Sequence, residues 1–109
     1  MQVGDRTAEN EGIGLWLLAR VYALANSPEV ALDYADAYLK LADTEKLGAF
    51  HEGYAHEAIA HAHHVADSDA ECAAALGKAQ ACLEKIEEQE SRDLLKADLA
   101  GLEGGAKQS

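Results

Sequence analysis

The sequence predicts an all-α fold, and three observations lead to that prediction. Alanine and leucine together account for 37 of the 109 residues, and both rank among the best helix formers. Valine, isoleucine and threonine, which favour strands, number only nine in total, and there is one proline. Helix start signals also recur along the chain. Because 109 residues suffice for one hydrophobic core, we expect a single helical domain.

The first helical hairpin is predicted to consist of two helices, Thr7 to Ala25 and Pro28 to Ala42. Ser27 is a favourable N-cap residue, and proline suits the first helical position, where the missing N–H costs nothing. Glu29 places a negative charge near the positive end of the helix dipole. Asn26, directly before this start, is expected to close the preceding helix.

The second hairpin is predicted to consist of Leu47 to Ala66 and Asp69 to Glu88. Ser68 is followed three residues later by Glu71, which is the spacing of a capping box. Asp67 is expected to close the helix before it. Both hairpins therefore have tight turns between their helices.

A fifth helix is predicted from Arg92 to Leu102, with Ser91 as its N-cap residue. Its leucines fall on one face and predict that it covers the end of the second hairpin: Leu94, Leu95, Leu99 and Leu102. The domain is expected to span residues 1–103. Residues 104–109, which include Gly104 and Gly105, are expected to form a flexible tail.

The two hairpins share a spacing of small and large residues. In the first, Leu15, Leu18, Ala19 and Tyr22 are followed by Ala31 and Ala35; in the second, His56, Ile59, Ala60 and His63 are followed by Cys72, Leu76 and Ala79. This spacing resembles the tetratricopeptide repeat (TPR), W-x-x-L-G-x-x-Y followed by A-x-x-x-F. The segment from Ala55 to Ala60 is also similar to a helix in small uncharacterised bacterial TPR-like proteins. The resemblance covers residues 12–86.

The resemblance implies right-handed superhelical stacking of two antiparallel helical hairpins, with the last helix as a cap. It also implies a concave groove, lined by the first helix of each hairpin, that binds a protein or peptide partner. Carried over position by position, the exposed groove residues are Trp16, Arg20 and Ala23 in the first hairpin and Glu57, His61 and His64 in the second, with Tyr54 one turn earlier. For Trp16 a place inside the hairpin is equally open, because leucines surround it.

The five histidines all lie between residues 51 and 64, which suggests an alternative function. Glu57, His61 and His64 have the identity and the helical spacing of ligands for Zn²⁺ or Ni²⁺, so a small metal-binding protein or metal-dependent enzyme is conceivable. The metalloprotease pattern H-E-x-x-H is absent, however, and no phosphate loop or nucleophile motif is present. The preferred expectation is a protein that is not an enzyme and needs no cofactor.

The charge of the chain restricts its partners. The formal net charge is −11 and the pI is about 4.7, whereas nucleic-acid binding requires clustered Lys and Arg. We therefore expect no nucleic-acid partner. No apolar run is long enough for a membrane span and no secretory signal precedes the first helix, so we expect a cytoplasmic protein without membrane contact. Cys72 and Cys82, about 15 Å apart along one helix, are expected to be free thiols.

A homodimer is also expected, because two repeats are fewer than the three or so that stacked arrays need. The exposed end of a short array must be covered by other apolar surface. The predicted seam involves Leu39, Leu41 and Leu47, together with Leu95 and Leu99 of the last helix.

Overall fold

The structure is a computed structural model that describes residues 7–108, with side-chain surroundings described as far as Leu102. Five helices follow one another along the chain: α1 (Ala8–Leu24), α2 (Pro28–Thr44), α3 (Ala49–Val65), α4 (Asp69–Lys85) and α5 (Gln89–Gln108). The described residues include no strand. The predicted all-α fold class, with two helical hairpins and a final helix, is confirmed.

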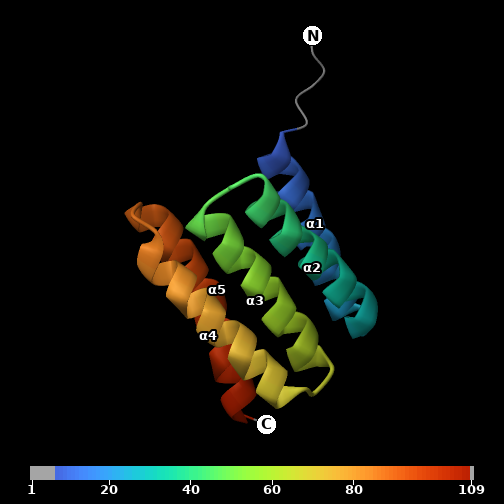
Figure 1. The fold of residues 1–109 in the computed structure, drawn as a ribbon. Helices are drawn as coiled ribbons and strands as arrows, with labels where there is room; N and C mark the ends of the chain where they lie inside the picture. Colours follow the sequence, from blue (N-terminus) through green and yellow to red (C-terminus); the bar gives the residue numbers. More distant parts are fainter. Residues whose placement is uncertain (1–6, 109) are drawn as a thin grey trace.

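The helices form two layers. Figure 1 shows α2, α3 and α4 side by side, with α1 behind α2 and α5 behind α4. Each helix packs against the next one in the sequence, and α3 also contacts both α1 and α5. By contrast, no contact joins α2 to α4, or α1 to α5, within the described residues. The central helix α3 therefore contacts all four of the others, and α1 and α5 both pack against it.

Helices α2 and α4 begin where the sequence predicts, at Pro28 and Asp69, whereas α3 begins at Ala49 instead of Leu47. Helix α5 begins at Gln89, so the expected N-cap residue Ser91 lies inside it and that expectation is wrong. Two further caps also differ. Ser27 and Ser68 occupy the N-cap positions of α2 and α4, yet neither side chain accepts a capping hydrogen bond. Their ψ angles are 69° and 77°, outside the extended conformation that aims an N-cap hydroxyl at the first turn. The expected capping box at Ser68 is therefore wrong. Thr7, with a ψ angle of 162°, does accept a bond from the Asn10 amide at 3.1 Å.

Asn26 and Asp67 close the first helix of each hairpin, as expected. Both adopt the left-handed conformation, with φ angles of 63° and 61°. The next amide then turns back onto the helix, so that Ser27 N–H donates to the Tyr22 carbonyl at 2.8 Å. Lys46 ends α2 in the same way with a φ angle of 53°. These bonds satisfy carbonyl groups that a helix end leaves without partners.

The last two helices differ from their predicted limits. α4 ends at Lys85, three residues early, and α5 begins at Gln89 and continues to Gln108. The predicted end of α5 near Leu102 is wrong, because the backbone through Gly104 and Gly105 stays helical. We also expected residues 104–109 to form a flexible tail. The side chains of this segment lie outside the described ones, so its flexibility stays a prediction. No helix in the described part of the chain is long and apolar enough to cross a membrane.

The larger part of the core lies between α3, α4 and α5. Its biggest buried side chains include Leu76, Leu83, Leu95 and Leu99, of which the last two are 0% and 1% exposed. The predicted seam through Leu95 and Leu99 is therefore wrong, because these residues fill the core of their own chain. Cys72 and Cys82 are free and buried, as expected.

Alanines dominate the packing between α1, α2 and α3. Ala19 packs with Ala35 and Ala58, and Ala23 with Ala31 and Ala62. Such small side chains let helix backbones approach closely. Leu18, which belongs to the spacing shared by the two hairpins, is 40% exposed.

Gly53 is the point where α3 meets α5 most tightly. A Cβ atom there would lie 2.5 Å from Leu95 Cδ2 and 3.3 Å from Cys82 Cβ. Gly53→Ala should therefore lower the free energy of unfolding by about 1–2 kcal/mol, since overpacking costs more than the gain in helix propensity returns. Gly77→Ala in α4, where a Cβ meets open space, should stabilise by about 0.5–1 kcal/mol. Urea denaturation of both variants would test this; equal shifts would contradict it.

Candidate functional site

Glu57 lies at the centre of the predicted groove residues, but it is not exposed as the sequence suggested. It is 1% exposed, because α1 and α5 flank α3 at this point. Its Oε1 accepts a hydrogen bond from Trp16 Nε1 at 2.7 Å, and Arg20 donates to Oε2 at 3.3 Å. Burial raises the pKa of Glu57, while the bond from Trp16 and the charge of Arg20 oppose that rise. Glu57 therefore acts as a buried anchor for α1.

Tyr54 and Trp16 form the next part of the site. Their rings pack edge to face, with centroids 5.6 Å apart. Tyr54 donates its hydroxyl to Asp98 Oδ2 of α5 at 2.5 Å. The guanidinium carbon of Arg20 lies 5.2 Å from the centre of the Trp16 ring, within the range of a cation–π contact. These contacts join α1, α3 and α5 through side chains held in defined orientations.

A pocket of about 320 Å³, which we call the polar pocket, lies between α1, α3 and α5. Its lining residues are Arg20, Glu57, His61, His64, Ala97, Asp98, Gly101 and Leu102. Arg20 keeps a side-chain exposure of 39% despite its bond to Glu57. Burial lowers the pKa of His61, and the nearby Arg20 and His64 lower it further. The pocket therefore combines the Arg20 cation, the His61 and His64 imidazoles and the carboxyl groups of Glu57 and Asp98.

The histidines of this pocket do not form a metal centre. Although Glu57, His61 and His64 line the same pocket, no three His, Cys, Asp or Glu residues among those described are placed to hold a metal ion. In addition, both oxygens of Glu57 already accept hydrogen bonds, from Trp16 and Arg20. The geometry therefore gives no support to the alternative of a metal site on this face.

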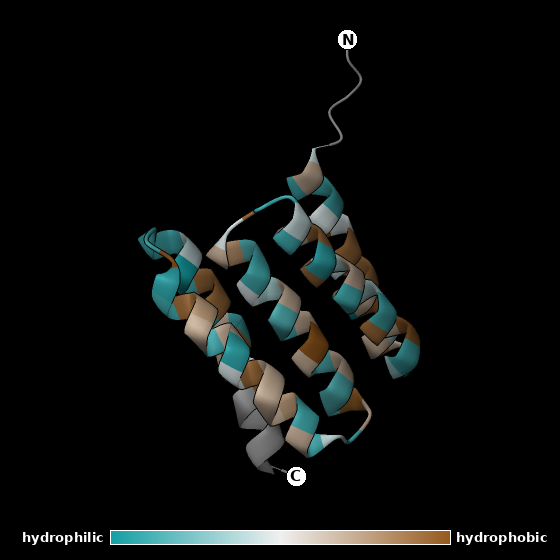
Figure 2. Cartoon of the chain, in the orientation of Figure 1, coloured by the Kyte–Doolittle hydropathy of each residue, from teal (hydrophilic) through white to brown (hydrophobic). Residues whose placement is uncertain are grey.

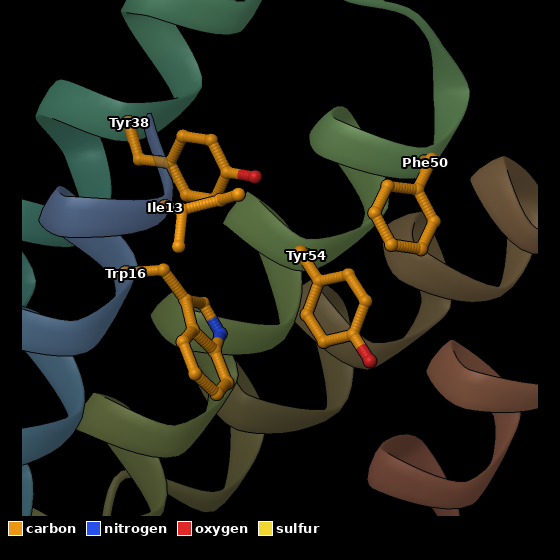
Figure 3. Close-up of a pocket in the computed structure, with 5 residues that line it drawn as sticks. All are labelled: Ile13, Trp16, Tyr38, Phe50 and Tyr54. Carbon is orange, nitrogen blue, oxygen red and sulfur yellow. The ribbon is translucent and has the colours of Figure 1, made fainter. Parts of the chain in front are cut away.

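A second pocket, of about 200 Å³, opens beside Trp16, and we call it the aromatic pocket. Its walls are four aromatic rings and one aliphatic side chain from α1, α2 and α3: Ile13, Trp16, Tyr38, Phe50 and Tyr54. Figure 3 shows these side chains converging around the space between them. The hydrogen bond between Trp16 and Glu57 links this pocket to the polar pocket. We call the two pockets together the groove.

Six of the seven residues predicted for the groove meet in this region. The seventh prediction, Ala23, is wrong, because Ala23 is 3% exposed and packs against Ala31 and Ala62. Sequence reasoning missed Asp98, which accepts the bond from Tyr54, and the Tyr38–His51 pair, whose tyrosine lines the aromatic pocket. Tyr38 is 2% exposed, and its hydroxyl lies 2.7 Å from His51 Nδ1. Tyr38 lies three residues after Ala35 and four residues before Ala42, and this helical spacing could have indicated that it is buried with them. A buried hydroxyl group needs a hydrogen-bond partner. Which residue supplies that partner depends on how α2 and α3 pack.

The comparisons with known proteins returned no match. No family model matches the chain, and neither the curated proteins nor the solved structures include a match. Function is therefore inferred from the geometry and chemistry of the groove.

Proposed function

We propose that the chain is a TPR-like protein-interaction module without enzymatic activity, which binds a segment of a partner protein in the groove. Two features of the helix packing support a TPR-like arrangement. Helix α3 contacts both α1 and α5, while α2 and α4 make no contact with each other in the described part of the chain. In this arrangement α5 takes the place of the first helix of a third repeat.

The single observation that carries the proposal is the network around Glu57. Trp, Tyr and Arg are the residue types most enriched at binding hot spots. Here Trp16, Arg20 and Tyr54 lie together in the groove, and Glu57 and Asp98 hold their polar atoms. A partner binding to such a surface loses little side-chain entropy, because the contact residues are already ordered.

Two glycine substitutions test where a partner binds. Gly101 lines the polar pocket and Gly77 lies on α4, away from both pockets, and a Cβ at either position meets open space. Peptides should first be selected on the native chain from a displayed random library. We expect Gly101→Arg to abolish or weaken their binding at least tenfold by occupying the groove. Gly77→Arg adds the same charge and length elsewhere and should leave the affinity unchanged.

Circular dichroism should show that both variants remain folded, since neither substitution meets a clash. Equal loss of affinity in both variants would point to a charge effect, and no loss in Gly101→Arg would place the binding surface elsewhere. Either outcome would contradict the proposal.

Self-association forms a second part of the proposal, and a separate surface of α1 favours it. Leu17, Val21 and Leu24 follow one another at i, i+4 and i+7 and are 52%, 57% and 73% exposed. We call them the outer stripe. In Figure 2, several of the parts of α1 that are visible behind α2 have the brown apolar colour. Between Gly12 and Leu24 the only charged residue is Arg20, so two acidic chains can approach here with the least repulsion.

We expect a mass near twice 11.6 kDa in sedimentation experiments at micromolar concentration, with a larger dimer fraction at high salt, which screens the acidic surfaces. Val21→Glu should return the chain to a monomer. Leu94→Glu, at a side chain of α5 that is 59% exposed, is the matched control and should leave the dimer intact. A native chain that stays monomeric at every concentration would contradict self-association and leave groove binding unaffected.

A further inference from the structure

The aromatic pocket is closed to hydrogen bonding although three of its five side chains carry a polar atom. Trp16 Nε1 donates to Glu57, the Tyr54 hydroxyl donates to Asp98, and the Tyr38 hydroxyl is paired with His51. Figure 3 shows the Tyr54 oxygen directed away from the space between the rings. The walls therefore offer carbon atoms and ring faces to an occupant. A polar group placed there would lose its hydration without gaining a partner.

The size of the pocket restricts the occupant further. Its volume is about 200 Å³, whereas sites for drug-sized ligands and cofactors measure about 300–1,000 Å³. Ile13 forms part of the wall and is 47% exposed, so the pocket is reached from the surface. These dimensions suit one large apolar side chain better than a complete small molecule.

Charge near the pocket indicates what surrounds that side chain. Glu9 is 65% exposed at its side chain and lies 3.9 Å from His51 Nε2, and the His51 ring packs against both Tyr38 and Phe50 of the pocket. The whole chain carries a net charge of −11. Acidic surfaces attract cationic partners and repel acidic ones.

We propose that the aromatic pocket receives a single large apolar side chain, such as that of Phe or Leu, from a cationic amphipathic helix of a partner protein. The outer stripe, which continues along α1 from Ile13, has the i, i+4, i+7 spacing against which a helix packs. This inference rests on the proposed function and names the chemistry of its partner.

The probe is a synthetic amphipathic helical peptide that carries lysines on one face and leucines with one central Phe on the other. It lacks tryptophan, so the fluorescence of Trp16, the only tryptophan in the chain, reports binding at the pocket wall. We expect one-to-one binding that shifts this fluorescence. Replacing the central Phe with Ala should weaken the affinity about ten- to a hundredfold, and replacing the lysines with glutamates should abolish binding.

Two variants of the chain distinguish binding of the Phe side chain in the aromatic pocket from unspecific attraction between opposite charges. Ile13→Glu adds a negative charge at the pocket. If binding depended only on attraction between opposite charges, this variant would bind the cationic peptide more tightly. If an apolar side chain fills the pocket, the affinity should instead fall at least tenfold. Val30→Glu, at a side chain of α2 that is 38% exposed and lines neither pocket, should leave the affinity unchanged. Circular dichroism confirms that both remain folded.

Three results would overturn the inference: equal affinity for the Phe and Ala peptides, equal or tighter binding by Ile13→Glu, or binding of the acidic peptide. Library peptides that depend on Gly101 but lack a large apolar residue would leave the proposed function standing while this inference fails.

Discussion

Deletion of residues 91–109 should leave a chain that no longer unfolds cooperatively. The deleted part includes Leu95, Leu99 and Leu102, which are 0%, 1% and 8% exposed and complete the core against α3 and α4. Each buried leucine contributes about 1.5–3 kcal/mol, so their joint loss approaches the whole stability of a small domain, about 5–15 kcal/mol. Thermal unfolding followed by circular dichroism would show a broad, shallow transition.

Two adjacent leucines provide a finer version of this experiment. Leu95 is fully buried, whereas Leu94 is 59% exposed. Leu95→Ala should lower the free energy of unfolding by about 2–5 kcal/mol, and Leu94→Ala by less than about 0.5 kcal/mol. Urea denaturation measures both values. A truncated chain that melts cooperatively, or equal effects of the two substitutions, would show that α5 is dispensable for the fold.

Replacement of Glu57 by alanine should have the next largest effect. The substitution leaves the Trp16 indole N–H without an acceptor in a largely buried setting and removes the ionic partner of Arg20. An unsatisfied buried donor costs about 1–3 kcal/mol, and the lost packing adds to it, whereas Arg20 can regain water. We expect a loss of about 2–4 kcal/mol in urea denaturation, with a changed fluorescence of Trp16. A loss below about 0.5 kcal/mol, typical of surface sites, would contradict the anchoring role.

Glu57→Gln is the matched control, because it keeps the shape of the side chain and an oxygen acceptor while it removes the titration. Burial raises the pKa of Glu57 above its ordinary 4.5, so the folded state binds this proton more tightly than the unfolded state does. The stability of the native chain relative to Glu57→Gln should therefore increase as the pH falls from neutral toward 4.5. A stability difference that does not change with pH would contradict this.

The histidines affect both of these proteins in the same way. Burial lowers the pKa values of His51, His56 and His61, so the folded state favours their neutral forms. Their contribution to stability is present above the ordinary histidine pKa of 6.5 and is lost as the pH falls through the lowered values. Because this loss is shared, it cancels when the native chain is compared with Glu57→Gln.

Much of the groove could be predicted from helical spacing. Trp16 and Arg20 lie one turn apart on α1, and Glu57 and His61 one turn apart on α3, so each pair had to share a face once the helices formed. The structure adds the distances between the helices, such as the 2.7 Å bond from Trp16 to Glu57. Spacing also placed Glu57 at the surface, and this was wrong, because periodicity within α3 carries no information about how closely α1 and α5 flank it.

The sequence by itself determined the helical fold class, the starts of α2 and α4, and the turns at Asn26 and Asp67. These features depend on residue propensity and on bonds between residues close in the chain, so local chemistry is sufficient to specify them. Only the tertiary structure decided that Leu95 is buried while Leu94 is exposed, and that the carboxylate of Glu57 anchors α1. Those outcomes depend on contacts between residues far apart in the chain, such as Trp16 and Glu57, which are 41 positions apart. The packing of whole helices selects such contacts.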